Sequence, residues 1–219
     1  MQALPRSRLL RFVEQAYHLA RRAVARYSSK FSKRRYTLHQ HIVLLCLKVR
    51  KIPTNGVVGI DASGFDRSHA SKHYTKRTKL TIQQLKVTLF VDTRSNAILD
   101  VHVTTTRKHD SQIAPSLIKR NTGEVAVLLG DKGYDDQKVR ALARETGVRP
   151  LIKHRDFSSL HKAWNARLDA DIYGQRSQNE TVNSRLKRKY GAFVRSRRWW
   201  KQFRELVVGC LTHNIDKSL

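Results

Sequence analysis

The segment Val125-Ala-Val-Leu-Leu-Gly-Asp131 is a continuous apolar run that ends on a glycine and an acid. Such a run predicts a strand that is buried on both faces of a sheet. Val57-Val-Gly-Ile-Asp61 has the same form. Functional residues of open α/β sheets gather at the carboxyl ends of strands. If the two strands are parallel neighbours, Asp61 and Asp131 converge, and two carboxylates in a crevice suit Mg²⁺, which prefers oxygen ligands. For either Asp alone, a helix cap or a turn is the more common role.

The rest of the chain supplies the other elements of an α/β domain. Three further runs have the alternation and composition of strands: 85–91, 97–103 and 148–152. The first two of these are expected to form a hairpin. Asp110-Ser111 is predicted to cap one helix, and either Asp135 or Asp136 a second. The order of elements predicts a mixed sheet flanked by helices. The motif Pro53-Thr-Asn-Gly56 separates it from a helical first segment, so we expect domains at 1–53 and 54–219.

The charge points to a nucleic acid. The 219 residues include 44 Lys and Arg against 17 Asp and Glu, a net charge of +27. A polyphosphate backbone is the obvious partner for such an excess. The N-terminal residues 1–51 are strongly basic, with Glu14 as their one acid, and so is the C-terminal part. A membrane is not expected, because the longest apolar run, Ile42 to Leu47, is far short of a bilayer span.

One polar pattern near the C-terminal end is more specific. The segment from about 173 to 190 is predicted to be one helix, and spacings of three and four place on one face Tyr173, Arg176, Glu180, Asn183 and Lys187. A solvated stripe with one ion pair is the simplest explanation. A metal and phosphate site would instead need an acid for the ion and cations for phosphate oxygens, and this face has both.

These residues resemble a known family. Tyr-x₂-Arg-x₃-Glu-x₆-Lys is similar to the signature of the IS4/IS5 superfamily of insertion-sequence transposases. Asp61 in Gly-Ile-Asp-Ala-Ser-Gly looks like the first catalytic aspartate of that family, and Asp131 in Leu-Leu-Gly-Asp-Lys-Gly-Tyr-Asp like the second. Glu180 completes an Asp-Asp-Glu triad, and Lys108-His-Asp-Ser111 is also similar. The resemblance runs from about Val57 to the C-terminus.

The resemblance implies a ribonuclease-H-like fold and an enzyme that cleaves and transfers DNA strands. It implies two Mg²⁺ ions, with Mn²⁺ as a substitute, bound by Asp61, Asp131 and Glu180. It also implies DNA contacts by Tyr173, Arg176 and Lys187, and Lys132 is a further candidate. The partners would be the ends of the element and the target DNA. The protein would bind them as a homodimer, in the cytoplasm and associated with the nucleoid.

The C-terminal segment adds basic and aromatic residues. Eight cations and no acid lie between Arg185 and Lys201, and Arg185, Arg188 and Lys189 are candidates for phosphate contacts. A last helix is expected to place on one stripe Trp200, Phe203, Val207, Cys210 and Asn214, with Trp200 in the core. Cys46 and Cys210 are predicted to be buried thiols. His69 and His73 have the spacing of a zinc pair, but a phosphate-facing loop is the better interpretation.

One departure from the family leaves an alternative open. The chain passes almost directly from the helical segment before Lys51 into the strand of Asp61, where family members usually have a longer helical region. The N-terminal DNA-binding and dimerisation region is therefore expected to be shortened. The chain is either an active transposase or a DNA-binding remnant that no longer cuts. A general nuclease of the same fold and a basic RNA-packaging protein are the other interpretations. The RNA-packaging interpretation leaves the acids at the strand ends and Glu180 unexplained.

Overall fold

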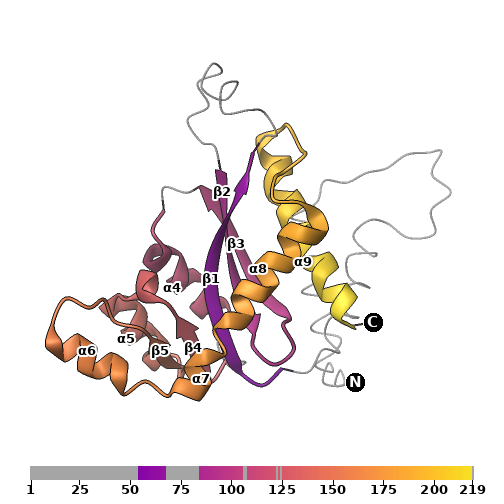
Figure 1. The fold of residues 1–219 in the computed structure, drawn as a ribbon. Coiled ribbons are helices and arrows are strands. Elements are labelled where there is room, and N and C mark those ends of the chain that lie inside the picture. Colours follow the sequence, from indigo (N-terminus) through magenta and orange to yellow (C-terminus); the bar gives the residue numbers. More distant parts are fainter. Residues whose placement is uncertain (1–53, 68–83, 106–107, 122, 124, 219) are drawn as a thin grey trace, which may run out of the picture. The chain divides into compact units, whose positions relative to one another are not determined.

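The computed structural model describes residues 54–67, 84–105, 108–121, 123 and 125–218, drawn in colour in Figure 1. The predicted N-terminal helices, the basic run 30–35, and His69 and His73 lie outside the described residues.

A five-stranded mixed sheet forms the centre of the described part, in the order β3-β2-β1-β4-β5. The strands are β1 Val57–Asp66, β2 Gln84–Asp92, β3 Ile98–Thr105, β4 Val127–Gly130 and β5 Arg149–Ile152. The first three form an antiparallel meander, while β4 is parallel to β1 and β5 is parallel to β4. All five predicted strands are present, and the sheet is mixed as predicted.

β1 is longer than the sequence indicates. The prediction that its strand ends at Asp61 is wrong, because antiparallel pairing with β2 continues to the pair Asp66 and Gln84. The apolar run stops at Ile60 because the next residues on one face border a polar cleft instead of a core. The parallel pairing with β4 does end near this point, at Gly59 and Leu129.

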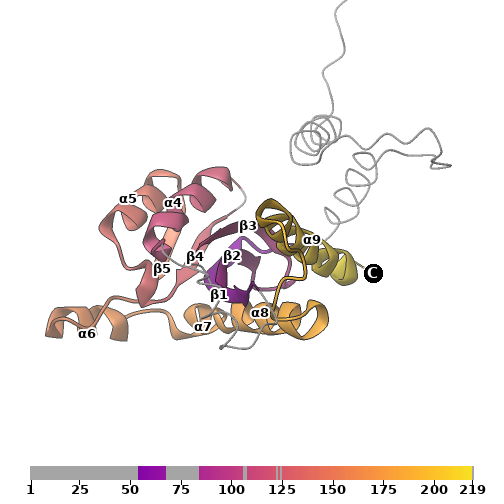
Figure 2. The ribbon, with the colours of Figure 1, turned by 90° about the horizontal axis from the view of Figure 1, so that it is seen from above.

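Helices cover both faces of the sheet (Figures 1 and 2). On one face, α4 Asp110–Arg120 and α5 Gln137–Glu145 bury a core that includes Ile60, Leu128 and Tyr134. On the other face, α8 Ser177–Tyr190 and α9 Trp199–Ser218 bury a second core around Leu85, Leu89 and Leu186. This three-layer arrangement confirms the predicted α/β class with a mixed sheet flanked by helices.

The structure decides between the predicted caps. Asp136 caps α5, since its side chain accepts a hydrogen bond from the backbone nitrogen of Lys138. Asp135 has another role, described below. Asp110 does not cap α4, because it is the first helical residue and His109 holds the cap position without a side-chain bond.

The predicted stripe on α9 is wrong for Trp200 and Val207. Trp200 is 47% exposed and Val207 is 44% exposed, whereas the buried side chains include Gln202, Leu206 and Cys210. The helix is turned because its polar residues face inward where they find partners. The Asn214 amide, for example, donates to the Ile98 carbonyl and accepts from the Ile98 nitrogen on the sheet edge. Trp200 instead pairs with Arg204 in a cation–π contact, with 4.7 Å between the guanidinium carbon and the ring centroid.

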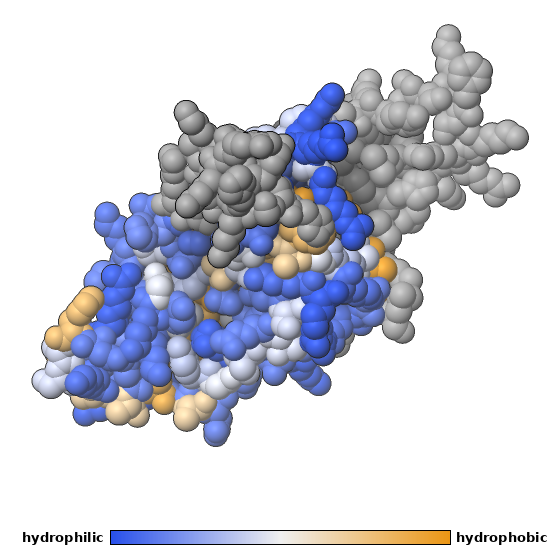
Figure 3. All heavy atoms as spheres, turned by 45° about the horizontal axis from the view of Figure 1, so that its top comes forward, coloured by the Kyte–Doolittle hydropathy of each residue, from blue (hydrophilic) through white to orange (hydrophobic). Residues whose placement is uncertain are grey.

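The buried thiol of Cys210 is confirmed, and burial raises its pKa to about 12. Two short helices that the sequence did not predict, α6 Ser159–Ala166 and α7 Ala170–Gly174, connect β5 to α8. The face in Figure 3 is largely hydrophilic, as the composition indicates. None of the helices in the described ranges has the length and hydropathy to cross a membrane.

Candidate active site

Asp61 lies in the middle of β1, on the face that α8 covers. Side chains alternate along a strand, so Gly59, Asp61 and Ser63 point to α8 while Val58 and Ile60 enter the opposite core. The side-chain amide of Asn183 on α8 donates a hydrogen bond of 3.0 Å to Oδ2 of Asp61. The helix therefore orients this carboxylate directly.

Asp131 follows β4 in a short 3-10 turn, η1 Lys132–Tyr134, and its Oδ1 accepts a hydrogen bond of 2.8 Å from the backbone nitrogen of Gly133. The β1–β4 register pairs Gly59 with Leu129, so Asp61 and Asp131 each lie two residues beyond the last pair. The sequence-based condition for convergence, parallel neighbouring strands, is thus confirmed. β4 stops here while β1 continues, which leaves the two acids at the same edge of the parallel pair.

The two carboxylates affect each other electrostatically. Burial raises the pKa of Asp61 above its ordinary value, and the charge of Asp131 raises it further. A backbone hydrogen bond at Ala62, the charge of Arg176 and the Asn183 amide oppose this change. The pair therefore concentrates negative charge in a partly buried place, and hard carboxylate oxygens of this kind are the donors that a divalent cation prefers. The side chains fit the metal ions that the resemblance implies.

α8 lines a cleft beside Asp61. The cleft is bordered by β1 and by one face of the helix: Asp61, Ser63, Glu180, Asn183, Ser184, Lys187 and Arg188. The predicted helical face is present on α8, since Glu180, Asn183 and Lys187 share this cleft. The Lys187 ammonium lies 5.5 Å from the centroid of the Phe65 ring.

Glu180 borders the cleft, but its carboxylate does not join the two aspartates. Its side chain is 61% exposed and forms an ion pair of 2.8 Å with Arg176, one turn earlier. Within the ranges that the structure covers, no three acidic, histidine or cysteine side chains are close enough together to hold one ion. The structure thus brings Asp61 and Asp131 together and places Glu180 at the rim of the same cleft.

The predicted single helix is divided before α8. Tyr173 belongs to α7, and Gln175 and Arg176 separate the two helices. Tyr173 still reaches the site, because its hydroxyl donates a bond of 3.3 Å to the Gly130 carbonyl at the end of β4. Burial raises the pKa of Tyr173. Asp169 caps α7, and its side chain accepts a hydrogen bond from the backbone nitrogen of Ile172.

The remaining predicted DNA contacts lie in two places. Arg185, Arg188 and Lys189 border a second groove between α8 and α9, which His213, Asp216 and Lys217 complete. Lys189 forms an ion pair of 2.5 Å with Asp216 there. Lys132 forms an ion pair with Asp156 at the protein surface. Arg188 borders both the cleft and the second groove.

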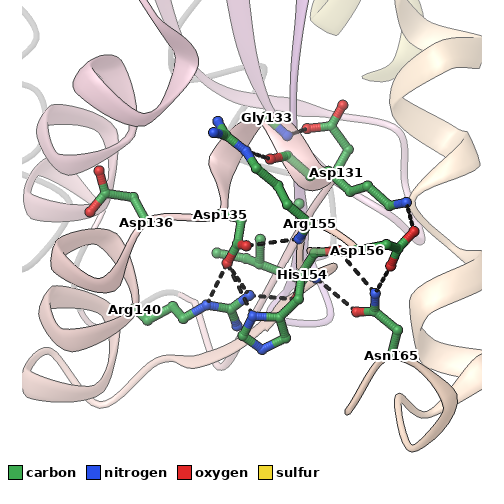
Figure 4. A network of polar contacts seen from close by, with 12 residues as sticks. Asp131, Gly133, Asp135, Asp136, Arg140, His154, Arg155, Asp156 and Asn165 are labelled. Atoms are coloured by element: carbon green, nitrogen blue, oxygen red, sulfur yellow. Dashed lines mark hydrogen bonds and ion pairs between the residues drawn. The ribbon is translucent and has the colours of Figure 1, made fainter. Parts of the chain in front are cut away.

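A second acidic site lies four residues beyond Asp131, and sequence reasoning missed it. Figure 4 shows the carboxylate of Asp135 surrounded by Arg140, His154 and the backbone of Arg155, while Asp136 points away. Arg140 bonds Oδ1 of Asp135 at 2.8 Å and also donates to the Ile152 carbonyl at 2.9 Å. Burial alone would raise the pKa of Asp135, but the hydrogen bonds from Arg155 and Arg140 hold it below its ordinary value. This site joins the turn after β4 to the end of β5.

A close approach between β1 and α8 was also not predicted. Asn179 is fully buried against Gly59, and a Cβ atom on Gly59 would lie 1.9 Å from Oδ1 of Asn179. Neither amide atom of Asn179 has a hydrogen-bond partner in the described part of the chain. The signal in the sequence is the pair of asparagines at i and i+4, Asn179 and Asn183, on the side of the helix that meets β1.

The chain matches a protein-family model and has similarity to solved structures. A family model described as a transposase DDE domain matches residues 52–215. The chain is similar to a chain of the simian T-cell lymphotropic virus intasome solved with the PP2A regulatory subunit B56 gamma, at 16% identity and a TM-score of 0.44 over 74% of this chain and 49% of that one. It is also similar to the catalytic core domain of BIV integrase, at 13% identity and a TM-score of 0.31 over 61% of this chain and 84% of that one. The chain therefore spans about half the length of the intasome chain that it matches. A search of curated proteins gives no significant match.

Proposed function

Since the chain belongs to the transposase DDE domain family, we propose that it is an insertion-sequence transposase of the IS4/IS5 type, a polynucleotidyl transferase that cleaves DNA and joins strands. One observation carries the proposal. Asp61 and Asp131 lie at equivalent positions beyond the parallel pairing of β1 and β4, and the cleft beside Asp61 is bordered by Glu180 and Lys187 of the signature.

Asp61, Asp131 and Glu180 would hold two Mg²⁺ ions, for which Mn²⁺ could substitute. When bound, such ions activate the attacking hydroxyl and stabilise the leaving oxygen of an in-line displacement at phosphorus. Asn183 keeps Asp61 oriented through its amide. Glu180 is free to turn inward, because an exposed i,i+4 ion pair such as the one with Arg176 contributes only about 0.3–0.5 kcal/mol.

The cations of α8 would bind the DNA backbone. Lys187 and Arg188 border the cleft, so they are placed to contact phosphates next to the cut. Tyr173 lies at the end of β4, and Arg176 pairs with Glu180 at the rim of the cleft. The second groove would continue this path along Arg185, Arg188 and Lys189, and Lys132 would join it by exchanging Asp156 for a phosphate.

The partners of this reaction would be the element ends and a target DNA. Residues 1–53 would form a DNA-binding and dimerisation domain, and residues 54–219 the catalytic domain of a homodimer. The enzyme would act on the nucleoid in the cytoplasm.

The position of Glu180 supports a second candidate, a DNA-binding remnant that does not cut. Its carboxylate pairs with Arg176 instead of completing the acidic site. A shortened N-terminal segment would have the same consequence, because the ends of the element would be bound without being assembled for cleavage.

Nicking of DNA decides between the two. The substrate is a supercoiled plasmid that carries the gene with its native flanking sequence, incubated with Mg²⁺ or Mn²⁺. We expect the wild type and a Glu145→Ala control, which changes an exposed acid on α5, to nick it, and Glu180→Ala to be inactive. Equal activity of Glu180→Ala would overturn its catalytic role. DNA binding by all three proteins without nicking by any would favour the remnant.

A further inference from the structure

Tyr134 is a buried tyrosine whose hydroxyl lacks a partner. Its ring packs in the core between the sheet and α4 and α5, and the whole residue is 1% exposed. Across the residues with described positions, its hydroxyl makes no hydrogen bond. Buried hydroxyl groups in proteins are nearly always hydrogen-bonded, to protein or to ordered water. Phe would fill the same core without this cost, so the hydroxyl needs an explanation.

The surroundings of this hydroxyl are acidic. Burial raises the pKa of Tyr134, and the nearby negative charges that raise it further are Asp110, Asp61 and Asp131, with Asp110 the strongest. Asp61 and Asp131 are the acidic pair described above. Asp110 belongs to the Lys-His-Asp-Ser motif and has no assigned role so far.

Asp110 reaches the same turn as Asp131. A Cβ atom placed on Gly133 would lie 3.0 Å from Oδ1 of Asp131 and 3.3 Å from Oδ2 of Asp110, so the two carboxylates flank one glycine. The other oxygen, Oδ1 of Asp110, is buried and forms an ion pair of 2.8 Å with Lys86 on β2, in a geometry that is not a hydrogen bond. Lys86 also donates to the Lys108 carbonyl. The sheet therefore holds Asp110 against the Asp131 turn.

We propose that Tyr134 and Asp110 are positioning residues of the acidic site, and that the Tyr134 hydroxyl holds a water molecule between Asp110 and Asp131. A buried water typically needs two to four polar partners, and one hydroxyl with two carboxylates supplies them. The water would fix the direction of the Asp131 carboxylate. Partners of this outer kind commonly change metal affinity by about 10–100-fold when they are removed. The inference rests on the proposed function, because it assumes that Asp131 binds a cation.

Tyr134→Phe tests this inference, because it removes only the hydroxyl. The readouts are thermal unfolding without metal, Mn²⁺ binding by calorimetry, and nicking as a function of Mn²⁺ concentration. We expect a melting temperature equal to or above that of the wild type, since no protein hydrogen bond is lost. We expect Mn²⁺ binding to weaken by about 10-fold, and the Mn²⁺ needed for half-maximal nicking to rise in parallel.

Tyr190→Phe is the matched control. Its hydroxyl donates to Asp216 at 2.8 Å, away from the acidic pair, so we expect its melting temperature to fall slightly and its Mn²⁺ binding to stay unchanged. Asp110→Asn should weaken Mn²⁺ binding as Tyr134→Phe does, and the double variant should be little worse than either single one.

Unchanged Mn²⁺ affinity in Tyr134→Phe would overturn the inference. If the melting temperature fell as well, the role of the hydroxyl would be purely structural. If the wild type binds Mn²⁺ but never nicks DNA, the proposed function fails while the comparison of Mn²⁺ affinities still decides on Tyr134. The two failures are therefore distinguishable.

Discussion

Two carboxylate sites meet at the turn after β4, where Asp131 of the first lies four residues before Asp135 of the second, and they differ in how their charge is balanced. At the first, Asp61 and Asp131 each lie two residues beyond the last β1–β4 pair, and the pKa of Asp61 is raised by burial and by its acidic neighbour. At the second, Asp135 is surrounded by Arg140, His154 and Arg155, and hydrogen bonds lower its pKa although burial opposes them.

The difference is the one expected between a functional site and a structural one. Two like charges held together reduce the stability of the fold, and proteins commonly keep such arrangements where a ligand or a reaction uses them. The Asp135 site satisfies its own charges and fastens the turn to β5. Substitutions at the two sites should therefore have opposite effects on stability and on activity.

Asp61→Asn should show the largest effect, and on activity alone. We expect nicking to fall by at least about 10²–10³-fold, the usual result of removing a group that stabilises charge in the transition state. We expect the free energy of unfolding to stay equal or to rise, because the repulsion with Asp131 disappears while Asn183 can still donate to the new amide oxygen. Parallel nicking and urea-denaturation measurements would show this, and a clear loss of stability would contradict a repulsive pair.

Arg140→Leu should show the reverse, a large effect on stability. The side chain of Arg140 is 6% exposed and that of Asp135 is 16% exposed. Removing one partner of a buried ion pair costs about 3–5 kcal/mol, because the other charge stays buried without compensation. Arg144→Leu, on the exposed side of the same helix, should change the free energy of unfolding by no more than about 0.5 kcal/mol. Equal urea midpoints for the two variants would show that the Asp135 site is not structural.

The pH dependence of stability should distinguish the two sites as well. The pKa of Asp61 is raised in the folded state, so its ionisation penalty is complete above the folded pKa and disappears as the pH falls to the ordinary value of 3.8. The gain in stability of Asp61→Asn over the wild type should therefore shrink as the pH falls from the folded pKa of Asp61 to 3.8. The pKa of Asp135 is lowered, so its stabilisation is complete above 3.8 and is lost as the pH falls through the folded pKa. The free energy of unfolding of Arg140→Leu should therefore stay below that of the wild type down to a lower pH. Urea midpoints between pH 7 and pH 3 would measure both.

Most of this arrangement could be predicted from the sequence where the pattern is local. The apolar runs before Asp61 and Asp131 predicted two strands, since continuous apolar strands need both faces covered. The structure meets the condition that the two be parallel neighbours. The limits of β1 could not be predicted in the same way. Residues 61–66 pair with β2 although the apolar pattern has ended, and such pairing depends on a distant strand.

The inward residues of the helices were harder to predict. On α9, Trp200 and Asn214 were expected on one inward stripe. Asn214 is buried and bonds to β3, but Trp200 is exposed, and Gln202 is buried where a neighbouring loop supplies a hydrogen-bond partner. On α8, the stripe of Glu180 and Lys187 was found by spacing. The direction of the Glu180 carboxylate was not, because a rotatable side chain on an exposed helix follows its nearest cation and not the periodicity of the chain.

Arg176 connects the acidic site to its surroundings, and Arg176→Gln should have the smallest effect. The ion pair with Glu180 is an exposed i,i+4 pair, so we expect the free energy of unfolding to change by less than about 0.5 kcal/mol. The charge of Arg176 also lowers the pKa of Asp61 and so partly offsets the repulsion at the acidic pair. In the wild type, the Arg176 guanidinium competes with Mn²⁺ for the carboxylates of Asp61 and Glu180, and Arg176→Gln removes this competition. Calorimetry should therefore show Mn²⁺ binding that is tighter by about twofold, the ratio that about 0.4 kcal/mol gives.

DNA binding by Arg176→Gln should instead be weaker, with a log–log salt slope smaller by about one phosphate contact. Weaker Mn²⁺ binding in this variant would mean that Arg176 organises the acidic site instead of competing with its cation.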